Sequence, residues 1–518
     1  MQEQTTPDRK PAQQRNQATA WPWGPALLVL ALTTAPYLWA AAHANEDWTF
    51  TGFLFAVDDG LSYIAKMRLG AQGAWLFRTP YTTRPTVGLP AFTAYLALGH
   101  LLHPRAEYAA FVLLFHAFRL AALLGLVHAL HRVLTWLLPA HPRWRTAVLL
   151  WTTLGGGLGW LPYALGRGAW VGWAPLSFHS PEAFGFLAVW GLPHLTAARA
   201  LWLYALWAYA HDRPRRALAA ALALLAFQPL YIVPLALLWL ALLRPKPQRV
   251  VPLVLASLAW SAYWAYMLWA RFTDPIVQAW DAQNNVRLVP WPALLLAYGP
   301  WLPWVGVGWN RLRARAPRPA RALAFWLLAV AGLMLVPTSV QRRLLEGVWW
   351  AWGLLVAHAM GANRARIWRL APWALAAVSP ALLLAAAWHA AARPGPPLFR
   401  ARAEAQAMHA WAQQAPLGAG ILAAYPTSTT LPAWAPVRAP LGHPVESPGW
   451  EQKRAALRTF FAPRTPDDQR RAWLRQLRVQ WLWWGPTERG LGSWDPRNAP
   501  YLEPAFRQGP YWVFRVRP

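Results

Sequence analysis

Residues 57–81 read VDDGLSYIAKMRLGAQGAWLFRTPY and place two adjacent carboxylates, Asp58 and Asp59, just after the first long apolar stretch of the chain. If a helix begins at Asp59, Ser62 and Lys66 follow on one of its faces, and apolar residues lie on the opposite face. This pattern predicts an amphipathic helix lying along a membrane surface. An acidic pair at such a surface indicates chemistry there.

The composition of the surrounding chain places it in a lipid bilayer. Of its 518 residues 56% are hydrophobic and only 13% are charged, whereas soluble domains average about 25% charged residues. The net charge of +29 is that of many nucleic-acid-binding proteins, but most arginines fall in short runs between apolar stretches, where membrane proteins keep their cytoplasmic charge. We therefore expect an integral protein of the cell membrane with no nucleic-acid partner.

The alternation of apolar stretches and basic runs predicts a mainly α-helical, polytopic bundle of about eleven spans. Residues 1–20 are polar and basic, and we expect them to be disordered and cytoplasmic. Residues 21–393 are expected to form the transmembrane part, in which each span needs about twenty apolar residues. Its first outer loop, residues 44–106, carries the acidic pair together with interfacial helices.

Two further stretches have their own predictions. Residues 217–243 have basic runs at both ends and FQPLYIVP in the middle, which indicates two short half-helices that meet at Gln228–Pro229 and keep both basic runs inside. After residue 393 the composition changes to amphipathic and short strand-like segments. We expect residues 394–518 to form a small soluble α/β domain outside the membrane.

Asp58 and Asp59 are the candidate catalytic residues. A carboxylate at the outer surface can act as general base on an acceptor hydroxyl, or the pair can hold a divalent cation such as Mg²⁺ or Mn²⁺. We prefer Asp58 by a small margin, because Asp59 shares its helix face with Ser62 and Lys66 whereas Asp58 is freer to turn into a cavity. The alternative is that Asp59 only caps the helix, which explains one carboxylate and not two.

Gln341, Arg342, Arg343 and Glu346 are candidate substrate-binding residues. The two arginines fall on the expected outer side of the membrane, against the usual bias of basic residues toward the cytoplasm. A lipid phosphate held between guanidinium groups would compensate their charge. The alternatives are non-specific contact with lipid head groups and pairing with Glu346.

Lys66, Glu182 and His194 complete the candidate substrate-binding set. Lys66 shares a helix face with Asp59 and Ser62. Glu182 and His194 fall near the outer ends of spans, where they can join an acid–base or metal site. A single histidine in a membrane protein is more often a packing residue, and this alternative stays open for His194.

Four segments together carry a resemblance to a known family: DDGLSYIAKMRLGAQGAWLF with the following PYT, PEAFGFLAVWGLPH, QRRLLEG and LGHPVES. With the topology around them, they resemble bacterial membrane proteins of the GT-C glycosyltransferase superfamily, over about residues 20–395. The superfamily includes protein O-mannosyltransferases, aminoarabinose transferases and oligosaccharyltransferases. The chain lacks a WWDYG motif, which argues against the oligosaccharyltransferase branch.

The resemblance implies a membrane enzyme that moves a sugar from a polyprenyl-phosphate donor to an acceptor at the outer face. Asp58 or Asp59 would be the base or the metal-linked carboxylate. A transporter or flippase for lipid-linked saccharides would share the broken helix and the outer arginines, but its polar groups should gather near the bilayer midplane. A scaffold for envelope assembly would leave the acidic pair without a role.

Overall fold

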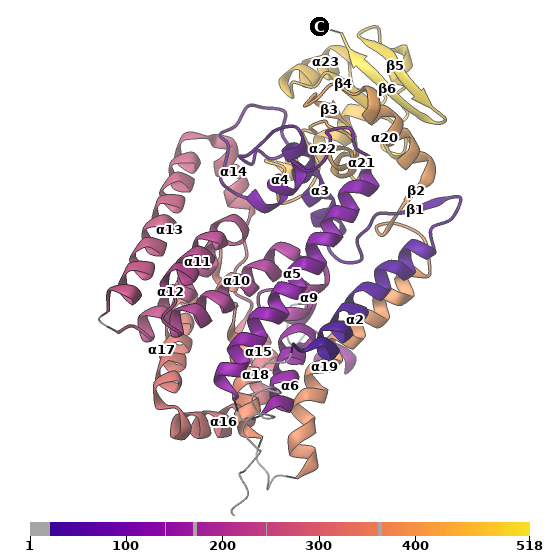
Figure 1. Cartoon of the computed structure of the whole chain (residues 1–518). Helices are drawn as coiled ribbons and strands as arrows, with labels where there is room; N and C mark the ends of the chain where they lie inside the picture. The colour runs from indigo at the N-terminus through magenta and orange to yellow at the C-terminus, as the bar shows by residue number, and fades with distance from the viewer. Residues whose placement is uncertain (1–20, 140, 169–173, 245, 361–364, 518) are drawn as a thin grey trace, which may run out of the picture.

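The computed structural model describes residues 21–139, 141–168, 174–244, 246–360 and 365–517, so the disorder expected of residues 1–20 lies outside the described part. The described chain is mainly helical, as predicted, and its long helices pack into a bundle with the C-terminal residues at one end (Figure 1). The main helices are α2 (Trp23–Ala42), α3 (Val57–Ala71), α4 (Thr93–Gly99), α5 (Tyr108–Leu137), α6 (Pro142–Leu154), α9 (Gly185–Gly191), α10 (Pro193–Ala210), α11 (Pro214–Phe227), α12 (Ile232–Ala241), α13 (Pro247–Thr273), α14 (Pro275–Gln283), α15 (Trp291–Tyr298), α16 (Leu302–Arg315), α17 (Pro317–Met334), α18 (Val348–Ala359) and α19 (Arg366–Ala391).

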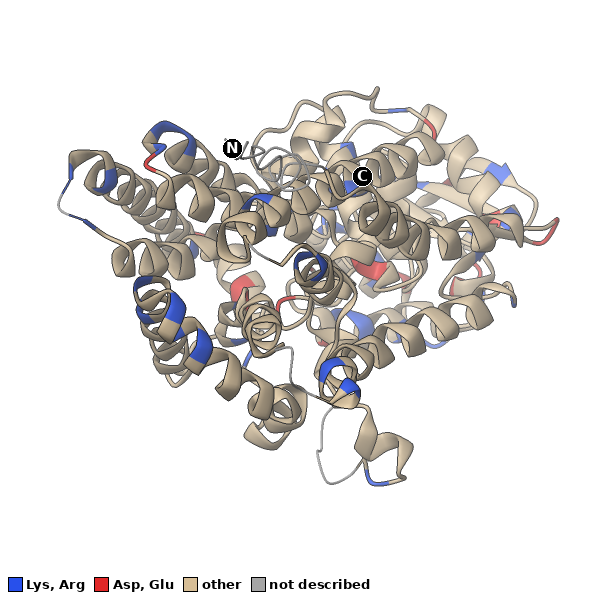
Figure 2. Ribbon diagram, turned by 60° about the horizontal axis from the view of Figure 1, so that its bottom comes forward, with Lys and Arg blue, Asp and Glu red and all other residues tan. Residues whose placement is uncertain are grey.

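Four of the described helices, α2, α5, α13 and α19, are long and apolar enough to cross a membrane. At 1.5 Å per residue, the 30 residues of α5 extend about 45 Å, more than the ~30 Å of bilayer hydrocarbon. Viewed from below, Lys and Arg lie mostly at helix ends and in connecting segments (Figure 2). These features describe a membrane protein, while the count of about eleven spans and the sides of the two termini remain predictions.

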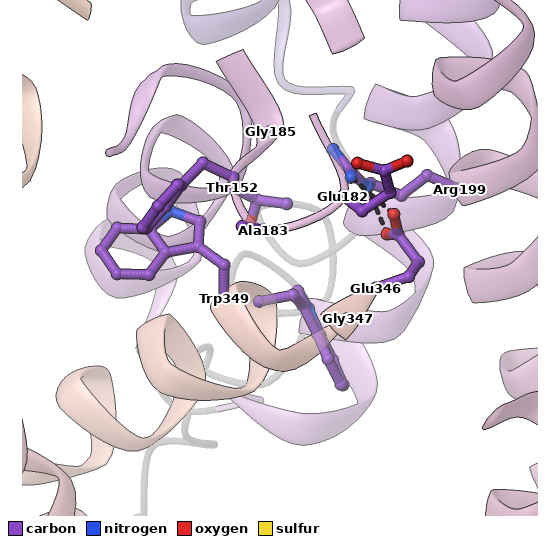
Figure 3. A pocket seen from close by; sticks show the side chains of 10 residues that line it. Thr152, Glu182, Ala183, Gly185, Arg199, Glu346, Gly347 and Trp349 are labelled. Atoms are coloured by element: carbon purple, nitrogen blue, oxygen red, sulfur yellow. Dashed lines mark hydrogen bonds and ion pairs between the residues drawn. The ribbon is translucent and has the colours of Figure 1, made fainter. Parts of the chain in front are cut away.

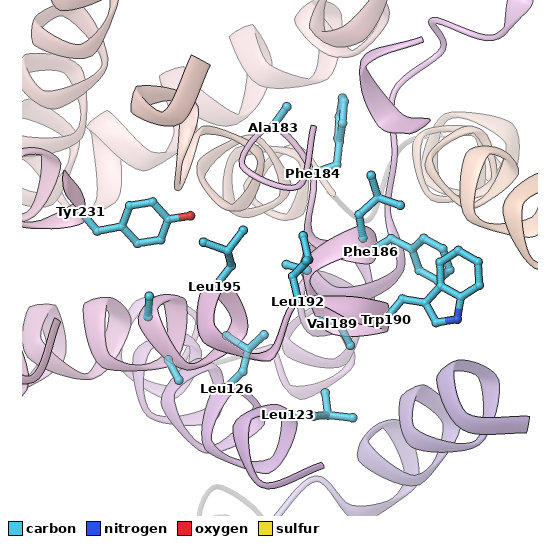
Figure 4. Close-up of a cluster of buried hydrophobic side chains, with 14 of the residues drawn as sticks. Leu123, Leu126, Ala183, Phe184, Phe186, Val189, Trp190, Leu192, Leu195 and Tyr231 are labelled. Carbon is cyan, nitrogen blue, oxygen red and sulfur yellow. The ribbon is translucent and has the colours of Figure 1, made fainter. Parts of the chain in front are cut away.

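The centre of the bundle is a tightly packed group of large apolar side chains around α9 and α10 (Figure 4). Helix α10 packs along α5 and α11, so it is held on two sides. This packing fixes the N-terminal end of α10, where His194 lies. The group includes Leu123, Leu126, Phe184, Phe186, Val189, Trp190, Leu192, Leu195 and Tyr231.

The helix break expected within residues 217–243 is present. Helix α11 ends at Phe227, Gln228 has the non-helical dihedral angles φ −154° and ψ 87°, and the short 3₁₀ helix η2 (Pro229–Tyr231) leads into α12. The proline ring disfavours helical geometry at the residue before it, which explains why the break falls at Gln228. Gln228 therefore lies in the break, between α11 and η2.

The C-terminal residues form a four-stranded sheet in the order β3-β4-β6-β5, in which β3 and β4 are parallel and the other pairs antiparallel. Three of the strands coincide with strand-like runs predicted from the sequence. The independent domain at residues 394–518 stays a prediction. The elements are β3 (Ile421–Leu422), β4 (Trp481–Trp484), β5 (Leu502–Gln508), β6 (Tyr511–Val516), α20 (Arg402–Gln414), α21 (Thr427–Trp434), α22 (Trp450–Phe461), α23 (Asp467–Gln476) and α24 (Pro486–Arg489).

These C-terminal residues are tied to the first outer loop. Strand β1 (Trp48–Phe50) pairs antiparallel with β2 (Phe399–Ala401), and α21 packs on α3. In Figure 1, α3 lies between the bundle and the C-terminal elements. Residues from both ends of the chain therefore meet around α3.

The expectation that α3 lies along an exposed membrane surface is wrong. Leu61 and Ile64 on one side of the helix are fully buried, and so are Ser62 and Lys66 on the other. The polar face is covered because α21 and residues near Glu446 pack on it. The polar side chains of this helix point into the protein and not toward lipid head groups.

Candidate functional site

A cavity of about 440 Å³ opens between the bundle and the C-terminal residues. It is lined by Asp59 from α3, His194 from α10, Arg342 and Arg343 from the 3₁₀ helix η4 (Gln341–Leu345), and His443 from the segment between α21 and α22. Four of these five were predicted site residues. The structure thus brings the acidic and basic candidates to one enclosed space.

Asp59 is the aspartate that faces this cavity. Its side chain is 45% exposed, and its Oδ1 accepts a hydrogen bond from Nε2 of His443 at 3.0 Å. Asp58 does not line the cavity, and its Oδ2 instead accepts a hydrogen bond from the hydroxyl of Tyr425 at 3.0 Å. The N-cap of α3 is Ala56, and no side chain caps the helix. The preference for Asp58 and the capping alternative therefore both lack support in the geometry.

Asp59 and His443 form a carboxylate–imidazolium pair. Burial raises the pKa of Asp59, but the hydrogen bond and charge of His443, with smaller effects from Lys66 and His194, outweigh it and bring the pKa below its ordinary value. Burial lowers the pKa of His443, but Asp59 and Glu446 outweigh it and bring the pKa above its ordinary value. Opposite charges favour each other's ionised forms, so each partner of the pair stabilises the charged form of the other.

Lys66 is committed to a buried ion pair and does not line the cavity. Its Nζ lies 2.5 Å from Oε1 of Glu446 and donates to the hydroxyl of Ser62 at 2.7 Å. The Ser62 hydroxyl in turn donates to the same Glu446 oxygen at 2.8 Å. Glu446 lines the cavity, so Lys66 acts on the site through this ion pair. Its Nζ also lies 4.0 Å from the ring centre of Phe92 in the cavity wall.

Removing one partner of this buried pair is expected to destabilise the protein strongly. The variant Lys66→Met leaves the Glu446 carboxylate buried without a cation, which costs about 3 kcal/mol or more. The double variant Lys66→Met/Glu446→Gln removes the stranded charge and should recover most of that loss. Thermal unfolding of the detergent-solubilised protein measures both, and equal melting temperatures for Lys66→Met and the wild type would contradict the role of the pair.

The guanidinium groups of Arg342 and Arg343 differ in how many of their hydrogen-bond donors have partners within the protein. Nη2 of Arg343 donates to Oδ1 of Asn284 at 3.3 Å, and its Nε lies 3.9 Å from Oε1 of Glu182. Nε of Arg342 is buried without a hydrogen-bond partner among the described residues, while its backbone N–H donates to the carbonyl of Val286. A guanidinium with an unsatisfied donor beside a second guanidinium is suited to an anion such as phosphate.

Gln341 and Glu346 have other roles in the fold. Gln341 accepts a hydrogen bond from the backbone N–H of Leu288 at 3.3 Å and donates to the carbonyl of Met334 at 2.9 Å, so it holds two backbone segments together. Glu346 is almost fully buried and pairs with Arg199, with Nη2 to Oε2 at 2.7 Å (Figure 3). The alternative that Glu346 pairs with Arg342 or Arg343 is not what the structure shows.

Of the two remaining candidates, His194 lines the main cavity and Glu182 lines a neighbouring pocket. Glu182 lines a small neighbouring pocket together with Arg199 and Glu346 (Figure 3), and its Oε1 lies 3.9 Å from Nε of Arg343 in the main cavity. His194 lines the cavity, with its Nδ1 2.7 Å from the hydroxyl of Tyr95. His194 is thus both packed and exposed to a ligand.

The residues near Asp58 and Asp59 do not fit the expected divalent cation. Among the described residues, no group of three or more His, Asp and Glu side chains is placed to hold a metal ion. The two aspartates turn to different partners, Tyr425 and His443. Oxygen-ligated cations need several converging oxygens, so no step of the chemistry below involves a metal.

Most of the residues that line the cavity were not predicted as site residues, and His443, Glu446 and Asn284 are the ones whose side chains bond to predicted residues. His443 and Glu446 belong to LGHPVES, a segment whose resemblance was noted without a role for its residues, and Asn284 directly follows helix α14. A polar His and Glu three residues apart in a Pro-rich turn were the available signal. Their partners are almost 400 residues away in sequence, which no local pattern reveals.

No protein-family profile and no curated protein matches the sequence. Among solved structures, the arabinofuranosyltransferase AftD from Mycobacteria matches at 15% identity with a TM-score of 0.51, over 95% of this chain and 42% of that one. ArnT from Cupriavidus metallidurans bound to undecaprenyl phosphate matches at 14% identity with a TM-score of 0.46, over 94% and 97%. The Archaeoglobus fulgidus oligosaccharyltransferase matches at 13% identity with a TM-score of 0.44, over 88% and 69%.

The match to AftD shows the fold. The chain shares the helical fold of this solved membrane transferase, in line with the fold that the sequence resemblance implied. It spans less than half the length of AftD, and at this level of identity the likeness extends to the arrangement of the helices and not to the reaction.

Proposed function

We propose that the protein is a membrane glycosyltransferase that moves a sugar from a polyprenyl-phosphate donor to a hydroxyl acceptor. The observation that carries the proposal is that Asp59 and the pair Arg342 and Arg343 line one cavity. Sugar transfer needs a base beside the acceptor hydroxyl and positive charge beside the leaving phosphate. The GT-C architecture, shared with a protein named as an arabinofuranosyltransferase, supports the same class of reaction.

In this mechanism Asp59 takes the proton of the acceptor hydroxyl as the hydroxyl oxygen forms a bond to the anomeric carbon. The bond between that carbon and the phosphate oxygen breaks, and its electron pair stays on the phosphate. Arg342 and Arg343 stabilise the charge that develops there. Oδ1 of Asp59 accepts the hydrogen bond from His443, so Oδ2 is the oxygen that takes the proton from the acceptor hydroxyl.

The proposal is tested by incubating the purified protein in lipid nanodiscs with radiolabelled polyprenyl-phosphate sugars and a membrane extract as the source of acceptors. We expect loss of the glycosylated carrier, release of polyprenyl phosphate and label in a new product. An unchanged donor in the presence of folded protein, together with movement of the donor across proteoliposome membranes, would favour the transporter alternative.

The pairing of His443 with Asp59 predicts how the rate of sugar transfer depends on pH. Because the pKa of Asp59 lies below its ordinary value of 3.8, the carboxylate is ionised throughout the range from pH 5 to 8, and its titration should leave the wild-type rate unchanged there. In His443→Gln the imidazolium is lost while burial, Glu446, Lys66 and His194 remain, so the pKa of Asp59 should rise. The rate of this variant should then fall as the pH is lowered toward 5.

A pH–rate profile of the two proteins checks this expectation. The same acid limb in wild type and His443→Gln would mean that His443 does not control the ionisation of Asp59. Thermal unfolding of the variant at each pH serves as the control for loss of structure.

A further inference from the structure

The loop that follows α14 joins the two chemical halves of the cavity. Nε2 of Gln283 donates to the carbonyls of Pro444 and Ser447, each at 3.1 Å, which ties the loop to the segment that carries His443. Three residues later, the carbonyl of Val286 accepts the backbone N–H of Arg342 at 3.1 Å. Residues 284–285, between these two contacts, line the same cavity as Asp59 and the arginines.

Besides Asp59 and Arg342, the cavity offers uncharged polar groups that can bind a ligand. Asn285 from the loop and Gln228 from the break between α11 and α12 both line the cavity. Neither carboxamide makes a hydrogen bond to another part of the chain that the structure describes. Trp264 and Trp280 complete this wall, and their indole nitrogens have no partner among the described residues either. Carboxamides and aromatic rings form a surface suited to a neutral, hydroxyl-rich ligand.

The carboxylates of the cavity are already paired with cations. Of the described lining residues three are acidic, and each has a cationic partner: Asp59 with His443 at 3.0 Å, Asp281 with Arg271 at 3.1 Å, and Glu446 with Lys66 at 2.5 Å. Oε2 of Glu446 has no hydrogen-bond partner among the described residues and can still accept a hydrogen bond, but the charge of each carboxylate is already balanced. An ammonium group on the bound sugar would therefore add a charge without a counter-ion, which is costly to bury.

Of the two arginines that line the cavity, one has a carboxylate partner and the other is left for a ligand. Arg343 has Glu182 at 3.9 Å, and Arg342 has no ion-pair partner among the described residues. Once the donor phosphate occupies the arginines, no further cation remains for a carboxylate on the sugar. The charge balance of the cavity is complete with one phosphate group and an uncharged sugar.

From this balance, and resting on the proposed function, we infer that the transferred sugar is uncharged and is held by Gln228 and Asn285 between Asp59 and Arg342. The carboxamides bind its hydroxyl groups, and the indoles of Trp264 and Trp280 pack against its ring. An amino sugar or a uronic acid on the same lipid carrier is excluded by charge and not by size.

Titration calorimetry of the full chain in detergent micelles tests the inference with four ligands. These are undecaprenyl phosphate alone and its conjugates with mannose, with an amino sugar and with a uronic acid. We expect the mannose conjugate to bind at least about tenfold more tightly than the bare carrier, because it adds several neutral hydrogen bonds. The two charged conjugates should bind no more tightly than the bare carrier.

Variants distinguish the contribution of the sugar to the binding affinity from that of the phosphate. Gln228→Ala and Asn285→Ala should each reduce the advantage of the mannose conjugate about three- to tenfold and leave the affinity for bare undecaprenyl phosphate unchanged. Gln413→Ala, which removes an exposed carboxamide on α20, is the matched control and should change neither. Unchanged melting temperatures show that the variants are folded.

The possible outcomes are distinct. A charged conjugate that binds as tightly as the mannose conjugate, or a mannose conjugate with no advantage over the bare carrier, would overturn the inference and leave the proposed function standing. Failure of all four ligands to bind the wild type would overturn the proposed function, and the inference with it.

Discussion

Replacing Asp59 by Asn is expected to lower the rate of sugar transfer about a thousandfold. Asn cannot take a proton from the acceptor hydroxyl, and a positioned general base contributes roughly 10²- to 10⁴-fold to such reactions. The amide oxygen can still accept the hydrogen bond that Asp59 receives from His443. The variant should therefore fold normally and bind undecaprenyl phosphate as the wild type does.

Asp58→Asn is the matched control for this variant. It makes the same chemical change one residue away, on a side chain that bonds to Tyr425 and does not line the cavity. We expect its initial rate, measured as consumption of labelled donor, to stay close to that of the wild type. Loss of activity in Asp58→Asn with retention in Asp59→Asn would reverse the assignment of the base.

Replacing Arg342 by Gln is expected to weaken binding of undecaprenyl phosphate about tenfold to a hundredfold. A hydrogen bond to a charged group contributes about 1.5–3 kcal/mol, and each 1.4 kcal/mol is a factor of ten in affinity. The guanidinium of Arg342 has an unsatisfied Nε, so its loss removes contacts to the ligand and few contacts within the protein. Binding is measured by calorimetry at fixed ionic strength.

Arg343→Gln should weaken phosphate binding as well, and it should also lower the melting temperature, because Arg343 contacts Asn284 and Glu182. Arg287→Gln is the control, since Arg287 is an exposed arginine in the same loop region and does not line the cavity. Equal losses of affinity in Arg287→Gln and Arg342→Gln would mean that the lipid phosphate is attracted by general surface charge.

Much of the architecture could be predicted from local sequence signals. The helical bundle follows from long apolar stretches, and the break at Gln228 follows from the proline after it. Strand β5 escaped prediction because its sequence LEPAFRQ contains a proline and charged residues. The strand pairs only with β6 and has an irregularity next to Pro504, and a sheet edge is where a strand tolerates proline.

The site was predictable in its charges and not in its pairings. Asp59, Arg342 and Arg343 stood out because they are charged groups next to apolar spans, and the structure places all three on one cavity. Lys66 and Glu346 stood out for the same reason, yet each is buried against a partner, Glu446 or Arg199. Lys66 and Glu446 are 380 residues apart, and only the fold brings them together.

The preference between the two aspartates failed for a related reason. Helix geometry shows that neighbouring side chains point about 100° apart, but it does not show which direction is open. Asp58 turns toward Tyr425, and Asp59 turns toward His443 and the cavity. The segment that carries His443 decides the outcome, and it lies at the far end of the chain.

The most direct test of the central claim is an electron cryomicroscopy structure of the protein in nanodiscs with bound undecaprenyl phosphate. We expect density for the phosphate group between Arg342 and Arg343, in the same cavity as Asp59, with the region beside Asn285 left for the sugar. Density for the phosphate at another place on the protein, with the cavity empty, would contradict the proposed site.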